Sequence, residues 1–581
     1  MLLQRLVEYA AEHGDGPPFH RQLEFAWQLE LDLSGAPRSV ELTSLLQAQD
    51  KGRPRGVTHL APSAVRTVGV AANLAADDVQ YVLGWPDPDS GADRVAQCHD
   101  HFVELTRRWA DSPAGATDPV AQAVWAFYRD GHLTTIRRPD GITTKDRVLI
   151  TVDGAPALRA PSAAPFWTAE VAARKGGTRQ GLCLVCGLPG PLLDTVPGKV
   201  PSRLVPGASN DAALVSVNED VFGYGLTTKL GSTPLCMTCG DAITTGLREV
   251  LDSSGSMSYP GQDSRVAWWI AGGAEVDAMA MLDCPDPAQV TALIGSVHTG
   301  RPTGIEDTTR FCSLTVGGNV ARVMVRDWIE MPLDQLHRNV AAWFEDLRMV
   351  RLWPTEPEFV RLTQLIHCTG RWLRREKGYA RFTAKGADRP ESVHRDLLRA
   401  AMRGTPLPPA LLAHIVNRVR TDGRLDTARA ALLRLALIRL PHPGEPPMPR
   451  LDREHTDPSY LAGRVFAVLD SLQHAASGGQ LNATYSDRHF AGAVTNPRAA
   501  IVSGRRTATA WLRKLRRTKP GLAVDFDRRL TGIFDLIDAQ AGVPSRTTVR
   551  QQAQFLLGYH HQRADQFAAR PTTDTNPGDP A

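Results

Sequence analysis

The 581-residue sequence lacks any run of 18 or more apolar residues, and this absence argues against a membrane-spanning helix. Its first residues include Glu8 and Glu12 and lack the charged start and small-residue cleavage site of a secretory signal peptide. We therefore expect a cytoplasmic protein with no membrane partner.

The sequence also lacks the common short catalytic motifs. It contains no phosphate-binding G-x-x-x-x-G-K-[ST], no metalloprotease H-E-x-x-H and no nucleophile-elbow G-x-S-x-G. These absences remove the commonest enzyme classes, and we expect a binding protein without a catalytic site. One segment, Cys98-His-Asp-His101, could belong to a metal-dependent nuclease. Adjacent residues of a helix point in different directions, however, so we favour a polar helix face.

Charge is nearly balanced over the whole chain, with a formal net charge of +4. Positive charge, however, is concentrated near the C-terminus. Residues 498–529 contain ten Lys and Arg against two acids, and arginine outnumbers lysine there. The planar guanidinium suits phosphate contacts, although a GC-rich genome would also enrich arginine. The segment is thus a candidate nucleic-acid contact.

Cysteine is scarce, and four of the eight cysteines form two close pairs, Cys183/Cys186 and Cys236/Cys239. A two-residue gap lets both thiolates of a pair reach one ion, and four thiolates complete a tetrahedral zinc site that leaves no open position. Each pair precedes a glycine, Gly187 or Gly240, which permits a tight turn. We predict a structural zinc ion; the alternative is four buried cysteines without metal.

Hydrophobic patterning predicts an α+β protein: a mixed N-terminal domain with an inserted zinc-ribbon-like element, then a largely helical C-terminal bundle. The expected divisions are a mixed domain at 1–355 with zinc-binding region 180–245, a helical region at 356–440, a bundle at 450–570 and a disordered tail at 571–581. The prolines of residues 441–449 predict a linker, and Asp457-Pro458 predicts a helix start.

The same patterning predicts individual elements. Strands are expected at 23–33, 81–84 and 266–270, and a β-hairpin at 311–328 with its turn at Gly317–Asn319. Helices are expected at the N-terminus and, further along the chain, at 103–108, 121–128, 333–350, 411–419, 427–439, 499–515, 526–539 and 545–567.

Four stretches, in order along the chain, resemble one protein family. They are residues 77–84 (DDVQYVLG), residues 206–218 with 222–225 (PGASNDAALVSVN and FGYG), residues 318–328 (GNVARVMVRDW) and residues 460–469 (YLAGRVFAVL). Together they resemble the Csd-type large subunit of type I-C CRISPR interference (Cascade) complexes, which serve antiviral defence. The second cysteine pair is not part of the family pattern, so the zinc prediction rests on spacing alone.

The resemblance implies a large subunit that inspects the protospacer-adjacent motif of duplex DNA, aids unwinding and supports recruitment of a helicase-nuclease. Its expected partners are crRNA, double-stranded target DNA, the backbone and crRNA-processing subunits, a small subunit and the helicase-nuclease. In RNA-guided systems base pairing identifies the target, and the protein recognises the short motif and the backbone.

Motif recognition requires amide or basic side chains on loops, although each candidate is equally compatible with an ordinary surface position. The candidates for DNA binding are Lys51, Arg53, Arg55, Arg66, Asn73, Lys199, Arg203, Ser209 and Asn210. The candidates for contact with a nucleic-acid backbone are Arg371, Arg374, Arg375, Arg505, Arg506, Arg513, Lys514, Arg516, Arg517 and Lys519. For the first three of these, the alternative is a solvated amphipathic helix.

Two other functions fit the same residues. One is a zinc-containing enzyme that processes nucleic acid and uses the region from Cys98 to His101. The other is a zinc-stabilised scaffold that does not touch nucleic acid.

Overall fold

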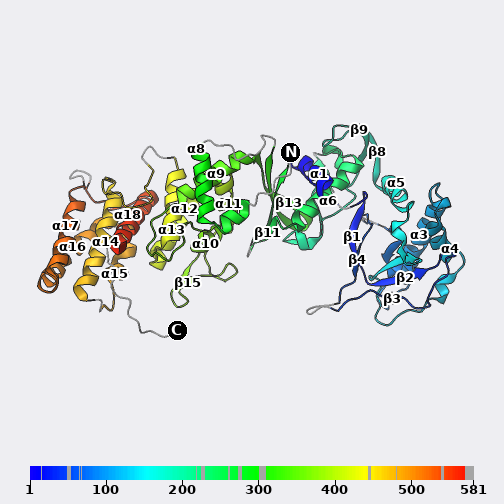
Figure 1. Ribbon diagram of the computed structural model, residues 1–581, viewed down its shortest axis with the longest axis horizontal. Coiled ribbons are helices and arrows are strands. Elements are labelled where there is room, and N and C mark those ends of the chain that lie inside the picture. Colours follow the sequence, from blue (N-terminus) through cyan, green and yellow to red (C-terminus); the bar gives the residue numbers. More distant parts are fainter. Residues whose placement is uncertain are drawn as a thin grey trace. The chain divides into compact units, whose positions relative to one another are not determined.

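The computed structural model describes residues 1–14, 16–48, 54–64, 66, 69–217, 219–223, 225, 229–259, 262–271, 278–299, 309–441, 446–478, 481–537 and 542–568 (Figure 1). The chain forms two compact units. The first contains Met1–Ser258, Asp263–Ala271 and Ser313–Trp328; the second contains Tyr259–Gln262, Gly272–Cys312 and Ile329–Ala581. Residues 356–440 and 450–570, which the sequence predicts as separate domains, both lie in the second unit.

A five-stranded sheet covered by helices forms the larger core of the first unit. Strands β3 (Thr43–Ser44), β2 (Trp27–Leu31), β6 (Arg147–Val152) and β5 (Ala76–Asp78) are neighbours in that order, and β7 (Ala155–Pro156) also pairs with β6. The strands β2 and β6 run parallel, with Trp27 opposite Val148. The helices that contribute to this core are α2 (Val79–Val82), α3 (Ala92–Ala110), α4 (Pro119–Arg129) and α5 (Ala163–Lys175).

Two strand predictions for this region need correction. The alternating segment 23–33 is not one strand: it divides at Ala26 into β1 (His20–Phe25), which pairs with β4 (Val57–Pro62), and β2, which belongs to the larger sheet. The alternation persists because both strands bury one face. Residues 81–84 contain no strand, since α2 occupies Val79–Val82 and buries Val79, Tyr81 and Val82.

The second part of this unit holds the cysteine region. The hairpin β8 (Gly176–Leu182) and β9 (Pro189–Leu193) precedes α6 (Met237–Asp252), which packs against α1 (Leu2–His13). A four-stranded sheet follows, in the order β10 (Ala208–Ala213), β13 (Arg310–Pro332), β12 (Arg265–Ala271) and β11 (Ser256–Ser258). The predicted strand at 266–270 is therefore confirmed.

The long strand β13 folds back on itself. A straight strand of its 23 residues would span roughly 75 Å. Its ends nevertheless meet, because the Leu333 N–H donates a hydrogen bond of 3.1 Å to the Thr309 carbonyl. Val320, with φ of +54°, adopts a left-handed conformation at the middle of the run. The predicted hairpin is confirmed, with its bend next to the predicted turn residues.

The described part of the second unit is mainly helical. Its first helices are α7 (Ala278–Asp283), α8 (Pro287–Thr299), α9 (Leu333–Leu347), α10 (Leu362–Cys368), α11 (Val393–Arg403), α12 (Pro409–Asp422) and α13 (Thr427–Arg439). The short hairpin β14 (Trp372–Leu373) and β15 (Gly378–Tyr379) follows α10. Together with the first unit, this arrangement confirms the α+β class.

Five helices end the described chain: α14 (Pro458–Ser477), α15 (Tyr485–Thr495), α16 (Pro497–Thr518), α17 (Pro520–Phe534) and α18 (Val549–Ala568). The α14 start is as predicted, because the Asp457 carboxylate accepts hydrogen bonds from the Ser459 and Tyr460 N–H groups. Figure 1 shows α18 beside α14, and these two helices pack together. The sequence prediction missed α15, although Thr484 and Asp487 form a capping box at its start.

Two adjacent histidines join α18 to the chain before the bundle. His560 Nε2 lies 2.9 Å from the Val350 carbonyl, and His561 lies between the Tyr460 hydroxyl and the Met349 sulfur. Burial lowers the pKa of His560 to about 4, so this ring is neutral at physiological pH. No helix in the described ranges is long and apolar enough to cross a membrane.

Candidate metal centre and nucleic-acid interface

The four paired cysteines are carried by two elements that backbone hydrogen bonds hold together. Cys183 directly follows β8, and Cys236 is the residue before α6. The Leu184 N–H donates to the Pro234 carbonyl at 2.8 Å, and an isolated bridge joins Leu192 to Cys236. Residues 187–235 thus leave the site and return to it.

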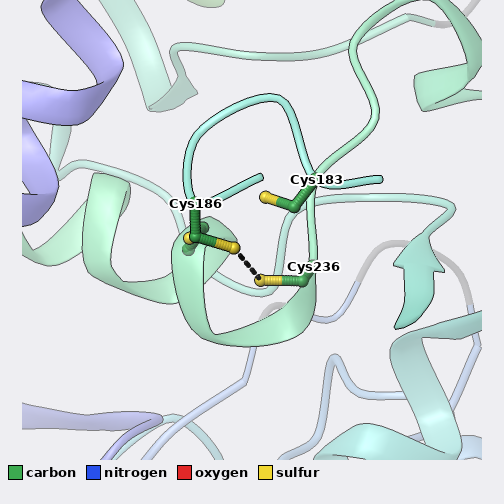
Figure 2. Close-up of side chains that lie close together, drawn as sticks. Cys183, Cys186 and Cys236 are labelled. Carbon is green, nitrogen blue, oxygen red and sulfur yellow. Dashed lines mark hydrogen bonds between the residues drawn. The ribbon is translucent and has the colours of Figure 1, made fainter. Parts of the chain in front are cut away.

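The sulfurs converge on one point, as Figure 2 shows for Cys183, Cys186 and Cys236. All four Sγ atoms lie within 4.8 Å of one another, and those of Cys186 and Cys236 are 3.9 Å apart. Tetrahedral zinc with Zn–S bonds of about 2.3 Å would place its ligands about 3.8 Å apart. The cluster therefore fits a four-thiolate zinc ion, and the predicted ligand set is brought together as expected.

The environment of the cluster favours thiolate at one sulfur. Burial raises the pKa of Cys183, but the backbone N–H groups of Cys186, Cys236 and Val185 outweigh it and lower the pKa to about 6. Burial raises the pKa of Cys236 and Cys239 above the ordinary thiol value. A bound cation would offset this burial cost, because a thiol that coordinates zinc is deprotonated.

The two glycines that follow the pairs serve different purposes. Gly187 has φ of +71° and makes the turn predicted for it, with its N–H donating to the Cys183 carbonyl at 2.9 Å. Gly240 instead lies inside α6. A Cβ there would approach Leu193 Cδ1 to 2.4 Å, so this glycine permits close packing of the helix on β9 and makes no turn.

The alternative metal segment does not assemble. In α3, His99 Nδ1 lies 2.9 Å from the Tyr81 carbonyl, whereas His101 Nδ1 accepts from the Ala72 N–H. Cys98 is buried in the core. Within the described ranges, the four paired cysteines are the only group of three or more side chains placed to hold a metal ion.

Six of the nine residues predicted to bind DNA line one cavity of the first unit. Its volume is about 930 Å³, and its walls come from β1, from residues 63–73, from residues 197–211 and from the end of α6. Ser209 and Asn210 lie exposed on β10, and neither side chain has a hydrogen-bond partner among the described residues. The predicted residues at this cavity are Arg66, Asn73, Lys199, Arg203, Ser209 and Asn210.

Arg66 is fixed at the cavity wall by a buried carboxylate. Its guanidinium contacts Asp77, whose side chain is only 2% exposed, and lies 4.1 Å from the centre of the Tyr81 ring. Asp77 also accepts from the Asn73 N–H at 2.7 Å. The neighbouring Asp78 has its pKa raised to about 6, by burial first and then by the charge of Asp77.

Most other cations of the cavity are paired as well. Arg203 makes a two-point contact with Asp252 at 2.9 and 3.0 Å, and Arg21 contacts Asp241. Lys199 has no ion-pair partner among the described residues. Sequence analysis missed Arg21, Arg147 and Arg248, which also line the cavity. These three arginines lie within regular strands and helices, and their spacing in the sequence does not indicate a binding site.

Among the remaining predicted DNA-binding residues, Arg55 does not line this cavity. Arg55 is exposed and bridges to Gln47 through the backbone. Lys51 and Arg53 lie outside the described residues.

The basic segment at residues 371–381 is a hairpin, so the amphipathic-helix alternative is wrong. Arg371, Arg374 and Arg375 are exposed around β14. Of these three side chains, only that of Arg374 makes a hydrogen bond among the described residues, donating to the Asp422 carbonyl at 3.5 Å.

The second basic segment forms the outer face of α16. All seven predicted cations of this segment are exposed. Arg516 pairs with Asp527 at 3.2 Å, and Arg505 lies over the Phe534 ring. The others have no ion-pair partner among the described residues: Arg506, Arg513, Lys514, Arg517 and Lys519.

The family profile described as CRISPR-associated protein (Cas_Csd1) matches residues 3–567. The chain belongs to this family. It is thus a CRISPR-associated protein. Comparison with curated proteins finds no match.

Two of the four stretches that resemble the Cas_Csd1 family line the cavity, and a third contacts one of its side chains. Residues 206–218 supply Ser209 and Asn210, residues 318–328 supply Ala321, and residues 77–84 supply Asp77, which holds Arg66. The fourth stretch, residues 460–469, is buried in α14. The family resemblance and the cavity, which are independent observations, therefore point to the same part of the first unit.

Proposed function

We propose that this Cas_Csd1-family protein is the large subunit of a type I-C surveillance complex and recognises the protospacer-adjacent motif with the 930 Å³ cavity. The observation that carries the proposal is the convergence of six predicted side chains on that cavity. They come from two segments, residues 66–73 and residues 199–210, which lie far apart in the sequence and meet only through the fold.

The chemistry of the cavity suits recognition of base edges. Asn210 offers an amide and Ser209 a hydroxyl, and both are unengaged among the described residues. Amides and hydroxyls distinguish base pairs by their patterns of donors and acceptors. Lys199, the unpaired cation, supplies attraction for phosphate, which positions a duplex without selecting its sequence. The cavity combines both requirements of motif recognition.

The paired arginines fit the same role. A guanidinium that is hydrogen-bonded to a carboxylate is held in one orientation, and its remaining N–H groups stay available to DNA. Binding then does not have to order this side chain, which would cost conformational entropy. Arg66 is fixed by Asp77, and Arg203 is fixed by Asp252. Such pairs lower the net positive charge of the cavity and favour specific over nonspecific binding.

We further propose that the exposed cations of α16 contact a nucleic-acid backbone. Four exposed cations of α16 without ion-pair partners among the described residues, and Lys519 directly after it, match the sequence-independent attraction that polyphosphates exert. The proposed partners are a guide RNA, duplex target DNA, the backbone and RNA-processing subunits, a small subunit and a helicase-nuclease.

The proposed role is one of binding, with strand cleavage left to a separate helicase-nuclease. The cysteine cluster is consistent with this role, because a four-thiolate zinc ion has no open position for substrate. It would instead fix β8 and β9 against α6, which carries one wall of the cavity.

Reconstitution tests the proposal. Guide RNA and the other subunits are assembled with and without this chain, and binding to matched target duplexes with and without the motif is measured. We expect motif-dependent binding only when the chain is present. Equal binding of both duplexes by the complete complex would contradict the proposal.

A further inference from the structure

A second cavity, of about 1030 Å³, lies within the second unit. Residues at the end of α7, residues 355–357, the helix α10 and the β14–β15 hairpin form its walls. Two of its lining residues, Tyr379 and Arg381, belong to the basic segment at residues 371–381, and the sequence singles out none of the others. Its lining includes two arginines, an amide, an aromatic ring and a thiol: Arg361, Arg381, Gln364, Tyr379 and Cys284.

Three hydrogen-bond donors of this cavity lack partners. Arg361, Gln364 and Arg381 are exposed, and no hydrogen bond or ion pair of their side chains occurs among the described residues. Arg361 also immediately precedes α10, where a cation opposes the helix dipole. Stabilisation of the fold therefore does not explain this arginine.

A buried ionic network holds the walls rigid. Arg429 is fully buried and donates to the carbonyls of Cys368 and Gly370 at 2.9 and 2.8 Å, and to Asp422 at 2.7 Å. Arg389 ties the end of α10 to the hairpin through the Ile366 and Ala380 carbonyls, at 3.1 and 2.8 Å. The unpaired donors thus project from a preorganised frame.

The hairpin beside the cavity is strongly basic, although one carboxylate, that of Asp283, also lines the cavity and accepts from the Thr363 hydroxyl at 2.7 Å. Exposed cations occupy positions 371, 374, 375, 377, 381 and 385 of the hairpin and its flanks, against one exposed acid, Glu376, in the same span. The half-buried Tyr379 ring also lines the cavity. Trp372 meets it edge-on at a centroid distance of 5.1 Å and the Arg429 guanidinium lies 4.9 Å from its centre, so only the remaining part of the ring faces the cavity. Cations beside aromatic rings form the usual surface for unpaired nucleic acid, because phosphates and exposed bases are bound together.

We infer that this cavity binds a segment of single-stranded nucleic acid, with Arg361, Arg381 and Gln364 on its phosphates and the Tyr379 side available to a base. A duplex would leave the ring unused because its bases are already stacked. The 930 Å³ cavity that we propose to recognise the motif, hereafter the motif cavity, belongs to the first unit and is built from other parts of the sequence. The inference can therefore hold or fail independently of that cavity.

Binding of single-stranded oligonucleotides to the purified full chain tests the inference. Fluorescence anisotropy is measured with a mixed-sequence 20-mer of DNA and with the same sequence in RNA, over a range of salt concentrations. We expect Arg361→Ala/Arg381→Ala to weaken binding at least tenfold and to reduce the slope of log K against log salt by about 1.4, for two lost phosphate contacts. Whichever 20-mer binds more tightly, the DNA or the RNA, identifies the kind of strand that this cavity binds.

Arg348→Ala/Arg450→Ala is the matched control. These two arginines are exposed in the same unit and do not line the cavity. We expect a change in affinity of less than twofold. Equal weakening in both double variants would show that only the general positive charge matters, and would overturn the inference.

Cys284 provides a local readout that needs no new label. Its exposed thiol lines the cavity. Alkylation of Cys284 by iodoacetamide is followed by mass spectrometry of the Cys284 peptide. We expect a saturating single-stranded oligonucleotide to slow this alkylation at least fivefold in the native chain. The same oligonucleotide should not slow it in Arg361→Ala/Arg381→Ala. An unchanged rate in the native chain would show that the strand binds elsewhere, whatever the motif cavity does.

Discussion

The cations of the motif cavity and those of α16 differ in what surrounds them. In the cavity, Arg66 and Arg203 are held by carboxylates, and Arg66 is only 26% exposed. On α16, Arg506, Arg513 and Lys514 stand exposed without ion-pair partners among the described residues. A paired arginine keeps a fixed geometry, whereas an unpaired one adapts to any nearby phosphate.

This contrast distinguishes two contributions to binding, discrimination between bases and salt-dependent affinity, which net charge alone does not distinguish. Fixed donors distinguish base edges, and mobile cations supply affinity that falls with salt. We therefore expect changes in the cavity to alter motif preference, and changes on α16 to alter affinity for all nucleic acid alike.

Loss of the metal should have the largest effect on the cavity. Cys239→Ser should lower the zinc content from about one ion per chain to near zero. Structural zinc contributes on the order of 10 kcal/mol to its folded site, so the first unit should unfold at a lower urea concentration. Binding through α16 should persist, because that helix belongs to the second unit.

Cys284→Ser is the control for this substitution, since Cys284 is exposed and outside the cluster. Zinc analysis of carefully handled protein should show no change there. Native protein without zinc would refute the metal assignment.

Removal of the Asp77 carboxylate, which contacts Arg66, should have the second-largest effect. Asp77→Asn leaves a mostly buried guanidinium with only the more distant Asp78 carboxylate, at 3.4 Å, and we expect a loss of about 3 kcal/mol, the lower end for a broken buried pair. Urea unfolding measures this loss. Asp527→Asn, which removes an exposed partner of Arg516, should change the free energy of unfolding by less than about 1 kcal/mol. Similar effects of the two substitutions would show that the mostly buried pair of Arg66 stabilises the fold no more than the exposed pair of Arg516.

Neutralising the α16 face should leave stability intact and reduce the dependence of binding on salt. Each phosphate contact to a single strand contributes about 0.7 to the slope of log K against log salt. Replacing Arg506, Arg513, Lys514 and Arg517 together by Gln should reduce that slope by about 3. An unchanged slope would show that this face does not contact nucleic acid.

The smallest expected effect is a pH dependence confined to the cavity. Burial, together with the charge of Asp77, raises the folded-state pKa of Asp78 from 3.8 to about 6. Between those values the folded chain retains a proton that the unfolded chain has lost. This group therefore lowers the free energy of unfolding as pH rises from about 4 to about 6, by on the order of 2 kcal/mol.

Asp78→Asn should remove that decrease, as measured by urea unfolding at several pH values. Asp89→Asn, at an exposed position, should retain it. A decrease that survives in Asp78→Asn would assign the pH dependence to another group.

Sequence analysis found the features that depend on local chemistry. The Asp457-Pro458 start of α14, the β12 strand and the four cysteines all follow from neighbouring residues or fixed spacing. Local rules failed where tertiary structure decides. Ala26 divides an alternating segment between two sheets, and residues 79–82 form a helix although Tyr81 and Val82 favour strands.

The cavity was only partly predictable for the same reason. Ser209, Asn210 and Lys199 stand out as polar residues in a glycine-containing loop and strand. Arg21 and Arg248 belong to regular elements, and only the fold brings them to the same wall. The partners Asp77 and Asp252 are likewise visible only in three dimensions.

Binding of the assembled complex to a library of target duplexes with a randomised motif tests the central claim most directly. Asn210→Ala should lose about 1–3 kcal/mol of discrimination between the preferred motif and its variants. Arg513→Gln should weaken binding to every member of the library by a similar factor. Full motif preference in Asn210→Ala and in the double variant Ser209→Ala/Asn210→Ala, or relaxed preference in Arg513→Gln, would contradict the account.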